Sequence, residues 1–134
     1  MDISNYWDLS YLLTGYNATI SFEVEQHLRN QVLTEMSASS TKAQQNSLSK
    51  LADGARANIE FYGDTISVDV YFVNIPKGME DYAEMLKSNA LSIIRVDLRE
   101  TIRDCLNFSD VREKIFTSCR QMIISELSSK LGGV

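Results

Sequence analysis

Residues 57–73 constrain the fold of this chain most strongly, because they predict a β-hairpin with one apolar and one polar face. Gly63 and Asp64 lie between two runs of alternating apolar and polar residues, a pattern typical of a two-residue type I′ or II′ turn. The predicted strand pairs are Tyr62–Thr65, Phe61–Ile66, Glu60–Ser67 and Ile59–Val68. The predicted apolar face consists of Ala57, Ile59, Phe61, Ile66, Val68, Val70 and Phe72. A slip of one residue would turn these side chains toward solvent, so the pattern also predicts the register.

A two-stranded sheet is only marginally stable in water, and both of its edges carry unpaired backbone groups. The hairpin therefore needs helices over its apolar face and a further strand at an edge. The sequence offers two sources for that strand, residues 18–24 of the same chain or a second chain.

The segment before the hairpin is predicted to be mainly helical. Residues 4–14 form a short helix that Gly15 ends. Residues 18–36 carry apolar residues at every fourth position, which favours a helix, although residues 18–24 also alternate as a strand would. Residues 37–47 are polar and read as an exposed linker or as the solvated start of a helix that ends near Asp53.

The segment after the hairpin is predicted to form two long helices. Residues 80–106 and residues from Asn107 or Ser109 to about Leu131 each carry an apolar stripe at helical spacing. The turn between them is short, so they should pack as an antiparallel helical hairpin over 80–131. The predicted fold is α+β, with helices flanking the 57–73 hairpin in a single domain over residues 1–134.

Length and composition agree with a folded globular chain. The 134 residues fit one domain, and 44% hydrophobic with 23% charged residues is an ordinary composition for a protein with a core. No apolar run approaches the roughly 20 residues of a membrane-spanning helix. The first residues lack the basic and apolar blocks of a secretory signal, so we expect a cytoplasmic protein of the cell that makes it.

The sequence contains no recognisable catalytic or metal-binding pattern. Cys105 and Cys119 lie in apolar stripes and are expected to be buried free thiols. His27 is the single histidine, and phosphate-binding and metal-ligand motifs are absent. We therefore expect no enzyme activity, no cofactor and no metal, with an enzyme built from scattered residues as an alternative.

Charge is distributed unevenly along the chain. Residues 1–75 contain four Lys and Arg against nine Asp and Glu, whereas residues 76–134 contain nine of each. An acidic surface repels phosphates, which argues against a nucleic-acid partner. Two alternatives remain, an inhibitor that imitates nucleic-acid charge and a winged-helix-like binder with residues 41–53 as its recognition helix.

Three arginines at helical spacing predict a basic ridge on the helix over 80–106, formed by Arg95, Arg99 and Arg103. The ridge could bind an acidic partner. It could equally be a solvated flank, because Asp97, Glu100 and Asp104 lie beside it.

The leading hypothesis from the sequence is a non-catalytic protein-binding or assembly module. It would act by self-association or by docking on a larger complex, as a virion component or a small acidic chaperone does. Aromatic and acidic side chains on the polar face of the hairpin and near the start of the chain are the candidate contacts. They are Trp7, Tyr11, Glu60, Tyr62, Asp69 and Tyr71.

Overall fold

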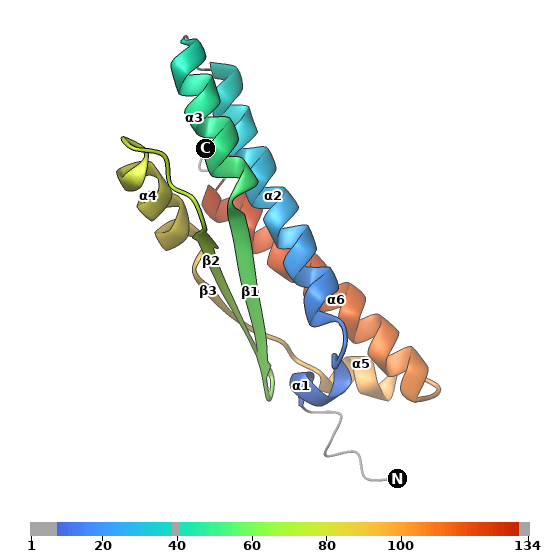
Figure 1. Ribbon diagram of the computed structural model, residues 1–134. Coiled ribbons are helices and arrows are strands. Elements are labelled where there is room, and N and C mark those ends of the chain that lie inside the picture. The colour runs from blue at the N-terminus through green and yellow to red at the C-terminus, as the bar shows by residue number, and fades with distance from the viewer. Residues whose placement is uncertain (1–7, 39–40, 132–134) are drawn as a thin grey trace.

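The computed structural model describes residues 8–38 and 41–131 and has an α+β fold, so the predicted fold class is confirmed (Figure 1). The described helices are α1 Leu9–Leu12, α2 Asn17–Ala38, α3 Lys42–Asp53, α4 Glu80–Ala90, α5 Arg99–Arg103 and α6 Phe108–Leu131. The described strands are β1 Ala55–Tyr62, β2 Thr65–Phe72 and β3 Ser92–Arg95. Within these ranges no helix combines the length and the apolar character that crossing a membrane requires.

β1 and β2 form the predicted hairpin in the predicted register, with Tyr62 opposite Thr65 and Phe61 opposite Ile66. Gly63 has a φ of +48°, and no described residue other than glycine has a positive φ. A positive φ at the first turn position alone is the type II′ geometry. Position 63 therefore favours glycine, whereas Asp64 keeps an ordinary backbone conformation.

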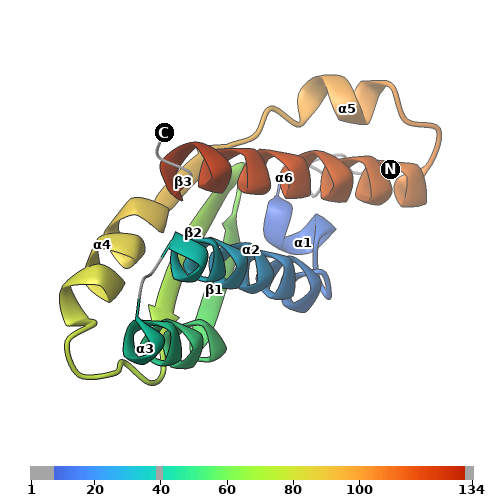
Figure 2. The ribbon, with the colours of Figure 1, turned by 90° about the horizontal axis from the view of Figure 1, so that it is seen from above.

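One face of the three-stranded sheet packs against helices and forms the core. The order of strands is β1-β2-β3, all antiparallel, and the predicted apolar side chains of the hairpin face inward. α2 packs on β1 and against α6, and the two helices run side by side in the same direction (Figure 1). Figure 2 shows α3 against α2 on the side away from α6. α4 packs on β2 and α6.

α2 is helical from Asn17 onward, so the strand alternative for residues 18–24 is wrong. The four-residue recurrence decides the outcome, because Ile20, Val24 and Leu28 are all buried on one helix face. α3 confirms the helical reading of the polar segment, since its N-terminal turns are solvated. Thr41 caps α3 by accepting a hydrogen bond from the Gln44 amide at 3.1 Å.

The predicted helix over 80–106 is interrupted, so the antiparallel helical hairpin over 80–131 is wrong in its first half. α4 ends at Ala90, β3 follows, and the short α5 precedes α6. β3 pairs with β2 and supplies the third strand that the hairpin needs. That strand comes neither from residues 18–24 nor from a second chain.

The spacing of apolar residues explains this difference. Residues four apart share one face of a helix, but they also share one face of a strand, which repeats every two residues. Ala90, Ile94 and Leu98 have this spacing and all point toward the core. β-branched Ile93, Ile94 and Val96 fit a pleated surface well, and the edge of β2 offers hydrogen-bonding partners.

Both ends of the described chain pack on the core. α6 is capped by Asn107, whose side-chain oxygen accepts a hydrogen bond from the Asp110 amide at 3.0 Å, and Ile115, Cys119 and Ile123 are buried along it. Of the short helix predicted over residues 4–14, the structure describes α1, followed by Gly15 at a φ of +93°. Residues 4–7 of that prediction lie outside the described residues.

The two cysteines differ in accessibility, which predicts a difference in reactivity. Burial raises the pKa of Cys119 to about 12, so its thiol stays protonated and unreactive near neutral pH. Cys105 is half-buried, and its Sγ lies 2.8 Å from the Thr101 carbonyl oxygen. We expect maleimide at about pH 8 to modify only Cys105 in the native protein and both thiols after unfolding, as measured by intact mass. A Cys105→Ser variant should remain unmodified when native, and modification of its Cys119 would contradict the prediction.

Candidate protein-binding surface

The face of the sheet opposite the core is solvent-exposed, and we call it the outer face. Alternation along each strand places polar, aromatic and charged side chains there. Its members are Arg56, Asn58, Glu60 and Tyr62 of β1, Thr65, Ser67, Asp69 and Tyr71 of β2, and Ile93 and Arg95 of β3. In Figure 1 no helix lies in front of β1 and β2 on this side.

Four of the six predicted partner-binding residues lie together on the outer face: Glu60, Tyr62, Asp69 and Tyr71. The Tyr62 hydroxyl donates to the Glu60 carboxylate. Tyr62 and Tyr71 are 56% and 45% exposed, and tyrosine is enriched in the contact surfaces between proteins. Whether these residues bind a partner stays a prediction.

The other two predicted residues do not join this surface. Tyr11 lies on α1, where its ring packs at a tilt against Phe108 of α6 with centroids 5.8 Å apart. Trp7 lies outside the described residues. The structure therefore gives no support for a second contact region near the start of the chain.

The outer edge of β1 is shielded by α2 and by the segment before it. The Ala57 amide donates to Glu25 Oε2 at 3.0 Å, and Asn17 Nδ2 donates to the Ile59 carbonyl at 3.2 Å. The Leu9 amide donates to the Gly63 carbonyl at 2.6 Å. Between these points Phe61 borders a hollow of about 310 Å³, which Ser10, Thr14, Gly15 and Asn17 line from the other side. Side chains of a helix thus replace a neighbouring strand along this edge.

Removing the Glu25 carboxylate should destabilise the protein by opening this edge. In Glu25→Ala the Ala57 amide loses its acceptor in a part-buried site, and we expect the free energy of unfolding to fall by about 1–2 kcal/mol. Glu25→Gln keeps an acceptor oxygen at that position and should lose less than half as much. Urea unfolding of the three proteins tests this, and equal stability of Glu25→Ala and the unaltered protein would contradict it.

The outer edge of β3 has no such cover. The hairpin turn directs the backbone amides and carbonyls of Thr65 and Ser67 toward β1. Those of Ile66 and Val68 point the other way and bond to residues 94 and 92 of β3. The amide of Val96 donates to the Asp64 carbonyl at 2.8 Å, which agrees with this alternation. The backbone groups of Ile93 and Arg95 then point away from the sheet, and no described residue bonds to them. We call these groups the open edge of β3.

Ile93 is the most exposed apolar side chain on the outer face, at 76%, and Leu91 just before β3 is also exposed. Sequence analysis missed both residues because it placed them in a helix. One signal could have revealed them, namely the three β-branched residues Ile93, Ile94 and Val96 within four positions, which favour a strand.

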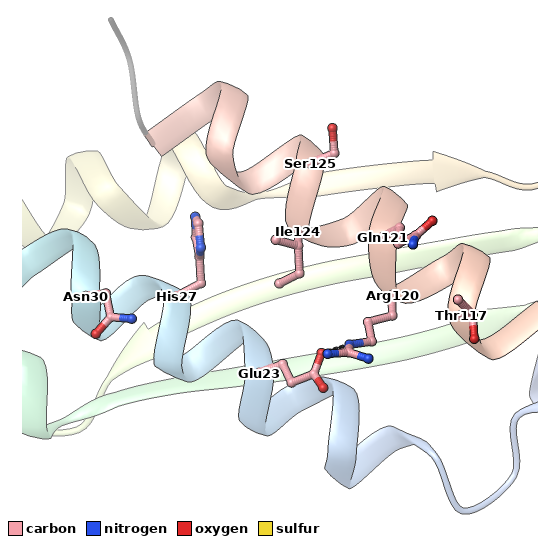
Figure 3. A pocket seen from close by; sticks show the side chains of 8 residues that line it. All are labelled: Glu23, His27, Asn30, Thr117, Arg120, Gln121, Ile124 and Ser125. Carbon is pink, nitrogen blue, oxygen red and sulfur yellow. Dashed lines mark hydrogen bonds and ion pairs between the residues drawn. The ribbon is translucent and has the colours of Figure 1, made fainter.

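A groove of about 660 Å³ lies between α2 and α6 (Figure 3). Ile124 is the one apolar residue among those that line it, and the Glu23–Arg120 ion pair bridges it at 2.6 Å. His27 lies in the groove with its Nε2 3.4 Å from the Ser128 hydroxyl, the contact that comes nearest to a nucleophile–base pair. No second hydrogen bond orients the imidazole among the described residues. Both residues lie within helices whose amides are already bonded, so no oxyanion site adjoins them.

The arginines predicted to form a basic ridge are divided between two elements, so the ridge is wrong. Arg95 lies on β3 and pairs with Asp64 at 3.6 Å, whereas Arg99 and Arg103 lie on α5. Arg99 pairs with Asp97 at 3.3 Å, and hydrogen bonds from the Arg99 amide and then from its guanidinium lower the pKa of Asp97. The acidic neighbours of these arginines therefore largely offset their charge.

A hollow of about 540 Å³ between α5 and α6 is lined by acidic side chains and Lys114. In the described parts of the chain, no three His, Cys, Asp or Glu side chains are close enough together to hold a metal ion. Comparison with protein-family models, with curated proteins and with solved structures found no significant match.

Proposed function

We propose that this protein is a non-catalytic protein-binding module that uses the outer face and the open edge of β3 to dock on another protein chain. The single observation that carries the proposal is the open edge itself, with Ile93 76% exposed beside it. Unpaired backbone groups and an exposed apolar side chain therefore lie together at one edge of the sheet.

Backbone pairing at this edge would provide affinity by adding a strand. A strand that bonds to Ile93 and Arg95 places alternate side chains on the outer face, where they meet fixed neighbours. β1 is the opposite edge, and its contacts with Glu25 and Asn17 leave less room for such an addition. A partner strand is therefore directed to β3.

Side chains of the outer face would add specificity. Tyrosine, arginine and isoleucine bury apolar area while their polar groups and neighbours select the partner. Glu60 and Asp69 on the same face disfavour an acidic ligand and favour a partner that offers a basic or neutral strand.

Position-specific photo-crosslinking in the cells that make the protein tests this proposal. A benzophenone amino acid would replace Tyr71 or Ile93 on the sheet. In a matched control it would replace Phe22, an exposed apolar residue of α2 at 59%. We expect both sheet positions to give the same adduct, identified by mass spectrometry, and the Phe22 position to give none of it. Adducts from Phe22 with none from the sheet positions would contradict the proposal.

The two alternatives from the charge pattern find no comparable support. α3 exposes Lys42 and Lys50, but the hairpin beside it carries Glu60 and Asp69 on its exposed face. These acids are too few and too far apart along the strands to imitate a row of phosphates, and they would repel a real one. The alternatives remain predictions from the sequence.

A further inference from the structure

We propose that the strand added at the open edge is β3 of a second copy of this chain, paired antiparallel with Ile93 opposite the partner's Ile93. The inference rests on the proposed function and names its partner. The product is a two-fold symmetric dimer with one continuous six-stranded sheet.

Symmetry makes a second copy a suitable occupant. Two identical edge strands related by a two-fold axis are necessarily antiparallel, and each supplies the same groups to the other. The open edge of β3 presents both an amide and a carbonyl at Ile93, which can bond reciprocally to those of the partner's Ile93. The amide of Arg95 then meets the carbonyl of the partner's Leu91, which accepts from Lys130 Nζ at 3.2 Å within its own chain and has a second lone pair for Arg95. The Leu91 amide is already bonded to the Lys87 carbonyl, so this pair is joined by one backbone hydrogen bond and the Ile93 pair by two.

Side chains on the outer face select this register. Ile93 and the partner's Ile93 become direct cross-strand neighbours, so the most exposed apolar side chain of the face is covered by its own copy. Leu91 lies next to the aliphatic part of the partner's Arg95. Asp69 lies on β2, beside Leu91. The partner's Arg95 is therefore two strand spacings, about 10 Å, from Asp69. The long side chain of the partner's Arg95 can span this distance.

Neighbouring registers match less well. A shift that centres the pairing on Arg95 places two guanidinium groups directly opposite each other. A shift that centres it on Ile94 puts Ile93 opposite the partner's Arg95 and moves Arg95 away from the partner's Asp69. Charge thus favours the proposed register, in which each Arg95 lies opposite the partner's Leu91 and near the carboxylate of the partner's Asp69.

Local charge also permits the approach of two acidic chains. The excess of acid belongs to residues 1–75, whereas β3 belongs to the half of the chain with equal numbers of acidic and basic residues. β3 is four residues long, so the interface is small and the dimer should dissociate readily on dilution.

Analytical ultracentrifugation over about 1 µM to about 1 mM tests the dimer, because a weak dimer falls in this range. We expect the mass to rise from 15.1 kDa toward twice that value with concentration. Ile93→Lys should weaken dimerisation at least about tenfold, whereas the matched control Phe22→Lys, at an apolar residue of α2 that is also exposed, should leave it unchanged. Circular dichroism checks that both variants stay folded.

A charge exchange tests the register. Arg95→Glu should weaken the dimer, and adding Asp69→Arg should restore it to within about threefold, because the pair is exchanged between chains. Within one chain Arg95 lies opposite Thr65, four residues along β2 from Asp69, so Arg95 and Asp69 do not compensate each other there. Arg103→Glu on α5 serves as the control for loss of a similarly exposed, ion-paired arginine.

The outcomes separate this inference from the proposed function. A concentration-dependent dimer that Ile93→Lys weakens and the charge exchange restores supports the inference. A monomer at every concentration, a dimer that Ile93→Lys leaves intact, or a double variant without recovery overturns it. In those cases the proposed function still holds if the photo-crosslinks from Tyr71 and Ile93 join a different protein, and it fails if those positions give no adduct.

Discussion

Replacing Ile66 with alanine should lower the free energy of unfolding by about 3 kcal/mol, within the usual range of about 2–5 kcal/mol for a buried isoleucine. Ile66 is fully buried near the start of β2, on the middle strand of the sheet, where its side chain packs in the main core. Truncation removes its apolar contacts and leaves a cavity that the surrounding sheet and helices cannot fill. Urea unfolding followed by circular dichroism measures the change.

Ile93→Ala is the matched control, because it removes the same atoms from a neighbouring strand on the opposite face. Ile93 is 76% exposed, so the free energy of unfolding of the monomer should change by no more than about 0.5 kcal/mol. The measurement should be made at a low concentration, at which any dimer has dissociated. If Ile93→Ala cost as much as Ile66→Ala, the register of β3 against β2 would be wrong by one residue.

Ile66 and Ile93 also lie in strands that differ in how well the sequence predicts them. The hairpin was predictable because its signals are local: a Gly-Asp turn and a two-residue alternation fix the register without reference to the rest of the chain. β3 was not predictable in the same way. Its four residues lie where a spacing of four suits both helix and strand, and the choice depends on β2, about 26 residues earlier in the chain.

The candidate surface was predictable to the same extent. Glu60, Tyr62, Asp69 and Tyr71 were placed on one face by the alternation of the hairpin alone. Ile93 and the open edge of β3 could be recognised only once β3 was known, because the backbone groups of a helix are bonded within the helix and cannot pair with another strand. The shielding of β1 by Glu25 and Asn17 is likewise a long-range arrangement, since nothing near these residues in the sequence identifies the amide or carbonyl they meet.

Arg112→Ala is expected to destabilise the protein about as much as Ile66→Ala, although Arg112 is only partly buried. Its Nε donates to the Leu12 carbonyl at 3.0 Å and its Nη2 to the Thr14 carbonyl at 3.2 Å. Its guanidinium carbon also lies 5.5 Å from the centre of the Tyr16 ring. Hydrogen bonds from a charged donor contribute about 1.5–3 kcal/mol each, and the cation–π contact adds somewhat less. Because these contacts share one side chain, they do not add fully, and we expect a loss of about 3 kcal/mol.

Geometry rather than charge should account for most of this loss. Arg112→Lys keeps the positive charge but cannot reach two carbonyls at once with a planar fork, so it should still lose about 2 kcal/mol. The matched control is Arg120→Ala, which removes an arginine of the same helix from its ion pair with Glu23. That pair is partly solvated, so its loss should cost less than about 1 kcal/mol. Full stability of Arg112→Lys, or equal losses for Arg112→Ala and Arg120→Ala, would contradict this account. The two hydrogen bonds of Arg112, which join residues about 100 positions apart, would then contribute nothing to stability, and other contacts would hold α1 and the segment after it to α6.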